Sequence, residues 1–129
     1  MRKPIRFFSV AITLSVVAAS SVALAGLNAS TGSVYVLANT YASGPVAGAR
    51  YSSDSAEYIG CEVSTAPGGT PWLWCFANNS SGTYLGCTSQ DVALVATARA
   101  VNETSEIAFD ASNGTCTYLW VTNASYFMH

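Results

Sequence analysis

Apolar and polar residues alternate along three short stretches in the middle of the chain, Ala56–Ser64, Pro71–Ala77 and Gly82–Cys87. A period of two residues is typical of strands with one buried face. The stretches are separated by the sequences TAPGG and NNSSG, which are rich in turn-forming residues. This pattern predicts a three-stranded antiparallel meander.

The period changes after the meander, in the sequence TSQDVALVATARAVN. Apolar residues there share one face of a helix: Leu94, Val95, Ala98 and Val101. Thr88 and Asp91 have the spacing of a capping box, in which the first side chain caps the helix and the second bonds back to it. We therefore predict one helix over roughly residues 89–101.

Alternation returns near the C-terminus, in the sequences SEIAFD and TCTYLWVT on either side of Ser112-Asn113-Gly114. Asn-Gly between two such stretches is a strong signal for a tight hairpin. Before the meander, Gly32–Tyr41 is compatible with a further strand, and residues 42–55 read as a loop or an irregular edge. The predicted fold class is α+β, with the meander and a C-terminal hairpin forming a small antiparallel sheet packed on one helix.

Strand register places all four cysteines on one face of this sheet. Turns centred on Gly68 and Ser81 bring Cys61, Cys75 and Cys87 abreast, together with apolar residues of the same parity: Ile59, Val63, Leu73 and Leu85. A two-residue Asn113-Gly114 turn adds Cys116 to this face. The same turn sets Ile107 opposite Trp120 and Phe109 opposite Tyr118, so Tyr118 and Trp120 are predicted to be core residues.

The cysteines, Cys61, Cys75, Cys87 and Cys116, favour two disulfides over a metal site. Zinc sites usually contain closely spaced cysteine pairs or histidines, whereas this chain has no C-x-x-C pair and only the terminal His129. We prefer the pairs Cys61–Cys75 and Cys87–Cys116. Because Cys75 lies between two neighbours in the predicted register, a Cys75–Cys87 link is the alternative.

The opposite face of the meander carries the candidate ligand-binding residues. The sequence WLWCF places Trp72 and Trp74 there, and the same parity adds three more side chains, those of Tyr58, Tyr84 and Glu62. Together they would make a flat aromatic platform. Phe76 has a structural explanation, since the register sets it between Gly60 and Gly86, whose bare backbones an aromatic ring can cover.

An alternative assigns both tryptophans to a second core layer. A sheet that is buried on both faces also gives strands as apolar as WLWCF. The segment Leu27–Ser55 would then have to fold over Trp72 and Trp74. Exposure of the two rings in the folded chain distinguishes a binding face from a second core.

Residues 1–25 have the features of a secretory signal peptide. Three basic residues, Arg2, Lys3 and Arg6, precede an apolar run that ends at Ala23-Leu24-Ala25. The run is short for a membrane anchor and is interrupted by serine and threonine. Cleavage after Ala25 leaves a single domain, residues 26–129, without a membrane span, so we expect a secreted or periplasmic protein.

Charge and composition narrow the function classes. Residues 26–129 contain no lysine and only two arginines against seven acidic residues, a formal charge of −5. Nucleic acids and anionic membranes are therefore unfavourable partners. Without an internal histidine, a free thiol or a close carboxylate pair on one face, we predict a protein that is not an enzyme. No nucleotide-binding motif, cofactor site or metal site is indicated.

These observations favour an exported non-catalytic binding domain that recognises a glycan or a protein through its aromatic sheet face. A second hypothesis is a secreted enzyme inhibitor or toxin-like effector that presents the loop Ala66–Pro71 to its target. A third is a structural envelope or matrix protein without a ligand. The sequence carries no signal for an oligomeric state.

Overall fold

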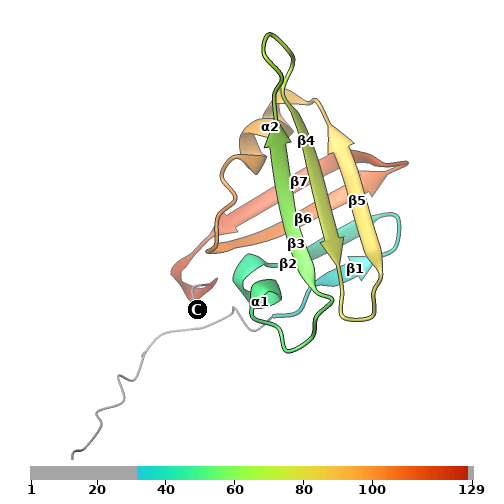
Figure 1. The fold of residues 1–129 in the computed structure, drawn as a ribbon, viewed down its shortest axis with the longest axis vertical. Helices are drawn as coiled ribbons and strands as arrows, with labels where there is room; N and C mark the ends of the chain where they lie inside the picture. Colours follow the sequence, from blue (N-terminus) through green and yellow to red (C-terminus); the bar gives the residue numbers. More distant parts are fainter. Residues whose placement is uncertain (1–31, 128–129) are drawn as a thin grey trace, which may run out of the picture.

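A seven-stranded mixed β-sheet dominates the computed structural model, which describes residues 32–127 (Figure 1). The predicted signal peptide, residues 1–25, lies outside the described residues. The elements in chain order are β1 (Tyr35–Leu37), β2 (Tyr41–Pro45), α1 (Val46–Arg50), β3 (Tyr58–Ser64), β4 (Trp72–Asn78), β5 (Tyr84–Ser89), α2 (Val92–Ala98), β6 (Ser105–Ser112), β7 (Thr115–Asn123) and a 3₁₀ helix, η1 (Ser125–Phe127).

The sheet has two halves, in the strand order β1-β2-β6-β7-β5-β4-β3. Figure 1 shows β3, β4 and β5 in front, and we call these the front half; β1, β2, β6 and β7 cross behind them and form the back half. All neighbours within each half are antiparallel. The halves join only where β5 meets β7, through one parallel pair, Thr88 with Thr115.

The core lies between the inner faces of the two halves. Leu73, Cys75 and Ala77 of β4 are fully buried, and so are Ile107 and Phe109 of β6. The expected α+β character is confirmed, but the prediction of a sheet packed on one helix is incomplete. The two helices are short: α1 contacts β2, β3 and β6, while α2 contacts β7, β3 and β4.

Small residues explain why β2 and α1 were not predicted from the sequence. Residues 42–50 read ASGPVAGAR, so they lack the large apolar side chains on which a periodic signal depends. At Gly44 the small size also serves packing. A Cβ atom there would lie 3.1 Å from the Cα atom of Val34, so a side chain at this position would require the two backbones to move slightly apart.

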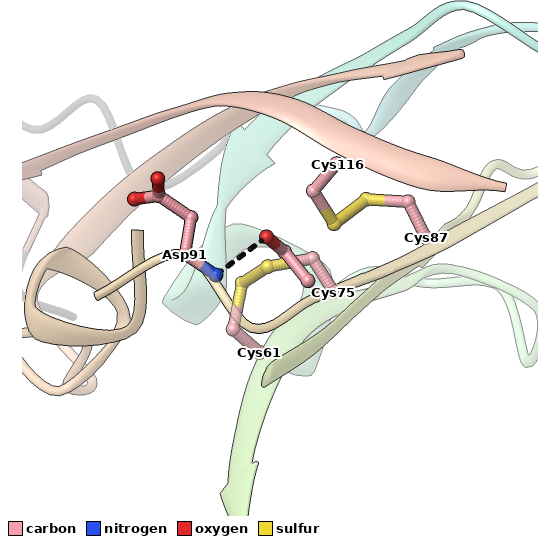
Figure 2. Close-up of a disulfide and its surroundings, with 6 residues drawn as sticks. Cys61, Cys75, Cys87, Asp91 and Cys116 are labelled. Carbon is pink, nitrogen blue, oxygen red and sulfur yellow. Dashed lines mark hydrogen bonds between the residues drawn. A yellow bond between two sulfur atoms is a disulfide. The ribbon is translucent and has the colours of Figure 1, made fainter. Parts of the chain in front are cut away.

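Helix α2 spans seven residues, Val92–Ala98, and is shorter than the predicted 89–101. Asp91 is its N-cap, and the Asp91 carboxylate accepts hydrogen bonds from the N–H groups of Ala93 and Leu94 at 2.9 and 3.0 Å. The Asp91 N–H in turn donates to Ser89 Oγ at 3.0 Å, the dashed line in Figure 2. Thr88 lies in β5, so the predicted Thr88–Asp91 capping box is wrong.

Two disulfides are present, Cys61–Cys75 and Cys87–Cys116 (Figure 2). The predicted register is confirmed at these positions, because Cys75 of β4 pairs with Cys61 on one side and with Cys87 on the other. The described cysteines include no free thiol. The alternative Cys75–Cys87 link is therefore excluded, and Cys87 instead connects the front half to Cys116 of the back half.

A β-bulge overturns the prediction for the C-terminal hairpin. Its Asn113-Gly114 turn forms as predicted, with positive φ angles of 50° and 77°. The register then shifts between Asp110 and Ala111, so that Thr117 has no partner in the ladder.

The bulge reverses the facing of the rest of β7, because side chains alternate between faces. Phe109 pairs with Leu119 instead of Tyr118, and Ile107 pairs with Val121 instead of Trp120. The prediction that Tyr118 and Trp120 are core residues is wrong. They are 52% and 42% exposed, whereas Leu119 is buried.

The Cys87–Cys116 disulfide should contribute more to the free energy of unfolding than the Cys61–Cys75 disulfide, because it links the two halves of the sheet. Replacing Cys87 and Cys116 with alanine should lower the free energy of unfolding by about 3–5 kcal/mol, and replacing Cys61 and Cys75 by about 2–3 kcal/mol. Loop lengths of 29 and 14 residues explain only part of the gap, since doubling a loop adds about 0.6 kcal/mol. Urea unfolding of the two double variants measures both free energies. An equal or larger loss of stability in the variant without Cys61–Cys75 would contradict the role of Cys87–Cys116 in linking the halves.

The bulged register also predicts opposite effects for two adjacent residues of β7. Leu119→Ala should cost about 2–5 kcal/mol of stability, because it opens a cavity in the core. Trp120→Ala removes a larger but exposed side chain and should cost about 1 kcal/mol or less. Thermal unfolding of the two variants checks this order, which would be reversed in a hairpin without the bulge.

Candidate functional site

The outer face of the front half, which faces the reader in Figure 1, brings the predicted ligand-binding residues together. Paired residues on adjacent strands share a face, so the register gives three rows. The rows are Tyr58-Asn78-Tyr84, Gly60-Phe76-Gly86 and Glu62-Trp74-Thr88. Trp72 pairs with Ser64 at the end of the same face.

Both tryptophans are accessible, although to different degrees. Trp74 is 37% exposed, Tyr58 45% and Tyr84 48%, while Trp72 is half-buried. The described part of the segment that could have covered them, residues 32–55, instead forms β1 and β2 of the back half together with α1. This segment therefore does not make a second core layer over Trp72 and Trp74.

Three rings of this face form a continuous aromatic strip, which we define as Tyr58, Phe76 and Trp74. The ring centroids of Tyr58 and Phe76 are 6.1 Å apart, and those of Phe76 and Trp74 are 4.9 Å apart. The rings are inclined to each other by 58° and 53°. The expectation of a flat platform is therefore wrong, and the strip is a ridge of tilted rings.

Two glycines seat the aromatic side chains on the sheet. A Cβ atom at Gly60 would lie 3.4 Å from the Phe76 ring, so Phe76 covers this backbone as predicted. At Gly86 the nearest atoms belong to Tyr84 rather than Phe76. The Tyr84 side chain therefore covers Gly86, where a Cβ atom would lie only 2.9 Å from the tyrosine Cζ atom, so a larger residue at Gly86 would displace this ring.

A shallow depression of about 390 Å³ adjoins the strip and is lined by Trp72, Thr88, Ser89 and Gln90. Thr88 and Gln90 are exposed, and their side-chain hydroxyl and amide groups can donate and accept hydrogen bonds. The sequence analysis did not single out these two residues. The sequence could have identified Thr88, because the confirmed register places it directly opposite Trp74.

The face offers contacts rather than reactive groups. Glu62 is exposed and is its only ionisable carboxylate among the paired rows. Within residues 32–127, no group of three or more histidine, cysteine or acidic side chains could hold a metal ion. No helix formed by these residues is long and apolar enough to cross a membrane.

The loop of the inhibitor hypothesis, Ala66–Pro71, is an ordered turn at the end of the front half. Its backbone is closed by a hydrogen bond from the Gly69 N–H to the Ala66 carbonyl at 2.9 Å. Residues 65–70 are exposed. A presented loop is thus available, but the accessible Trp74 favours the aromatic face as the binding surface.

A second depression, near α1, contains the carboxyl group of Asp54, which accepts hydrogen bonds from the backbone. It is lined by Arg50, Asp54, Glu57 and Tyr58, among other residues. Asp54 Oδ1 accepts hydrogen bonds from the N–H groups of Glu57 and Ala56, both at 2.7 Å. These bonds hold the pKa of Asp54 below its ordinary value of 3.8.

No protein-family model, curated protein or solved structure matches this chain. The functional argument therefore depends on the geometry of the described residues alone.

The turn at Asp54 gives a pH-dependent prediction. Because the folded-state pKa is lowered, the stabilisation is fully present above the ordinary pKa of 3.8 and is lost as the pH falls through the folded-state value. Asp54→Asn should therefore lower the melting temperature at pH 7, and its deficit relative to the unaltered protein should shrink below pH 3.8. Thermal unfolding between pH 7 and about pH 2.5 measures this. A deficit that stays constant with pH would contradict the assignment.

Proposed function

We propose that this protein is an exported, non-catalytic binding domain that recognises a glycan through the outer face of the front half. The observation that carries the proposal is the aromatic strip, in which Tyr58 and Trp74 are exposed and Phe76 between them is half-buried. The C–H faces of sugar rings stack on aromatic side chains, and a partly exposed ring on a rigid sheet can bind in this way without reorganising.

Polar groups around the strip suit a neutral ligand that is rich in hydroxyls. Thr88 and Gln90 line the depression beside Trp72, and Glu62 is next to Trp74 across the strand pair. These side chains offer hydrogen-bond donors and acceptors with a single negative charge among them. A neutral polysaccharide satisfies such groups at a lower desolvation cost than an anionic one would.

The tilt of the rings supports a particular form of glycan. A flat crystalline surface can contact several rings at once only when the rings are coplanar. The rings of the strip are inclined by 53° and 58°. A single soluble chain can bend along such a ridge, so we infer that the ligand is a free oligosaccharide or polysaccharide chain.

The proposal places the protein outside the cytoplasm. Residues 1–25 are the proposed signal peptide, and residues 26–129 the proposed mature domain, secreted or periplasmic. The two disulfides are compatible with an oxidising compartment. A peptide ligand for the aromatic strip, a role of the Ala66–Pro71 loop as an inhibitor, and a structural role without any ligand are the competing outcomes of the test below.

The test uses an array of soluble oligosaccharides, followed by titration of the best ligand with two tryptophan variants. Trp74→Ala should weaken binding by about 2 kcal/mol or more, which is roughly thirtyfold in Kd. Trp120→Ala, on the outer face of the back half, is the matched control and should bind as the unaltered protein does.

Thermal unfolding separates binding from folding in the same pair. Trp74 is only partly buried, so Trp74→Ala should cost about 1 kcal/mol of stability rather than the 3–5 kcal/mol of a buried tryptophan. The glycan proposal fails if no oligosaccharide binds the unaltered protein, or if Trp74→Ala and Trp120→Ala bind equally well.

A further inference from the structure

The back half has an exposed aromatic outer face of its own. We call it the second face and define it by its large side chains, Tyr35, Leu37, Tyr41, Tyr118 and Trp120. Cross-strand pairing arranges it in two rows, Tyr35-Ser43-Ala108-Trp120 and Leu37-Tyr41-Asp110-Tyr118. Because the core lies between the halves, this face points away from the aromatic strip (Figure 1).

The second face exists because of the bulge in β7. Without the unpaired Thr117, Leu119 would point outward, and Tyr118 and Trp120 would point into the core. Leu37 and Tyr35 are exposed at the other side of the face, and the rings of Tyr35 and Tyr41 are 6.2 Å apart. Clustered exposed apolar side chains on one side of a small domain are typical of interaction surfaces.

Two carboxylates lie on this side of the sheet, Asp110 within the second row and Glu106 just beyond the first row, where it pairs with Pro45 and Thr122. Glu106 and Asp110 are both on the outer side of β6, and both are partly buried. Between them lies Ala108, which is small. Trp120 pairs directly with Ala108, so each carboxylate is its diagonal neighbour, within reach of an aromatic side chain.

Neither carboxylate has an ionic or hydrogen-bonding side-chain partner among residues 32–127. Asp110 instead lies between two tyrosines, Tyr41 of β2 and Tyr118 of β7. Both acidic residues are partly buried, so solvent screens their attraction to a cation less than it would at a fully exposed site. Two cationic side chains of one extended segment could each pair with one of these carboxylates, which lie four residues apart on β6.

We propose that the second face binds a basic segment of a partner protein, with arginine or lysine side chains paired to Asp110 and Glu106. The neighbouring rings add cation–π attraction, for which tryptophan is the most favourable residue, and Trp120 flanks both acids. The net negative charge of the described residues also favours a basic ligand, since residues 32–127 contain two arginines against seven acidic residues.

The charge of the second face also separates it from the glycan site. The paired rows of the front half contain one carboxylate, Glu62, at the side of the strip. In the second face Asp110 lies between Tyr41 and Tyr118, and both Asp110 and Glu106 are diagonal neighbours of Trp120. The two proposals are therefore independent, and a protein with both sites would connect a glycan to a basic protein.

The test uses the purified protein and two synthetic octapeptides in which every second residue is glycine. One carries arginine, and the other carries citrulline, which keeps the shape of arginine without its charge. Isothermal titration calorimetry at low salt should give at least about tenfold tighter binding of the arginine peptide, which corresponds to one charge-assisted contact. Added salt should weaken the binding.

Three variants locate the interaction. Asp110→Asn and Trp120→Leu should each weaken binding of the arginine peptide by about fivefold or more, and Trp74→Ala should leave it unchanged. Glu103→Gln is the matched control, because it removes one negative charge from an exposed loop outside the face. Circular dichroism checks that each variant is folded.

The proposal is overturned if the protein does not distinguish arginine from citrulline. It is also overturned if Asp110→Asn and Glu103→Gln weaken binding equally, since that would show attraction to the net charge alone. Binding that survives Trp120→Leu would place the contact elsewhere. Neutral lipid vesicles are a further probe, and their binding in place of the arginine peptide would make the second face a membrane contact.

Discussion

The junction between β5 and β7 is the constraint on which the rest of the structure depends. One ladder pair, Thr88 with Thr115, and one hydrogen bond from the Thr88 N–H to the Gly114 carbonyl at 2.9 Å join the two halves of the sheet there. The Cys87–Cys116 disulfide lies one residue away on each strand. Because the core lies between the halves, this covalent link keeps their inner faces together and fixes the directions of both outer faces.

A small domain with such a core presents two aromatic faces. The buried side chains are of moderate size, and glycine and alanine allow close packing of strands. Phe109 is the large ring of this core, while the tryptophan rings lie on the outer faces. The front half carries tilted rings beside hydroxyl and amide groups and the single carboxylate of Glu62, and the back half carries rings beside two carboxylates, Asp110 and Glu106. This difference in electrostatics is the basis for assigning different ligand classes to the two faces.

The sequence predicts local features that depend on parity and turn chemistry. The register of Cys61, Cys75 and Cys87, the Asn113-Gly114 turn and the facing of Trp74 all follow from alternation around short turns. The bulge at Thr117 could not be read from alternation, because TCTYLWVT alternates well in either register. Nor could β2 and α1, whose alanine and glycine residues carry no periodic signal. Ring tilt depends on tertiary packing, so alternation alone could not predict that the aromatic strip is a ridge rather than a flat platform.

Amide hydrogen exchange of the variant with Cys87 and Cys116 both replaced by alanine tests the central claim most directly. If the disulfide holds the halves together, the Thr88 amide at the junction should exchange much faster than amides in the ladders of β3 with β4 and of β6 with β7. Each of those ladders has its own series of paired residues and should keep more protection. Equal protection at Thr88 and in the two ladders would show that packing alone joins the halves, and would contradict the role given to this disulfide.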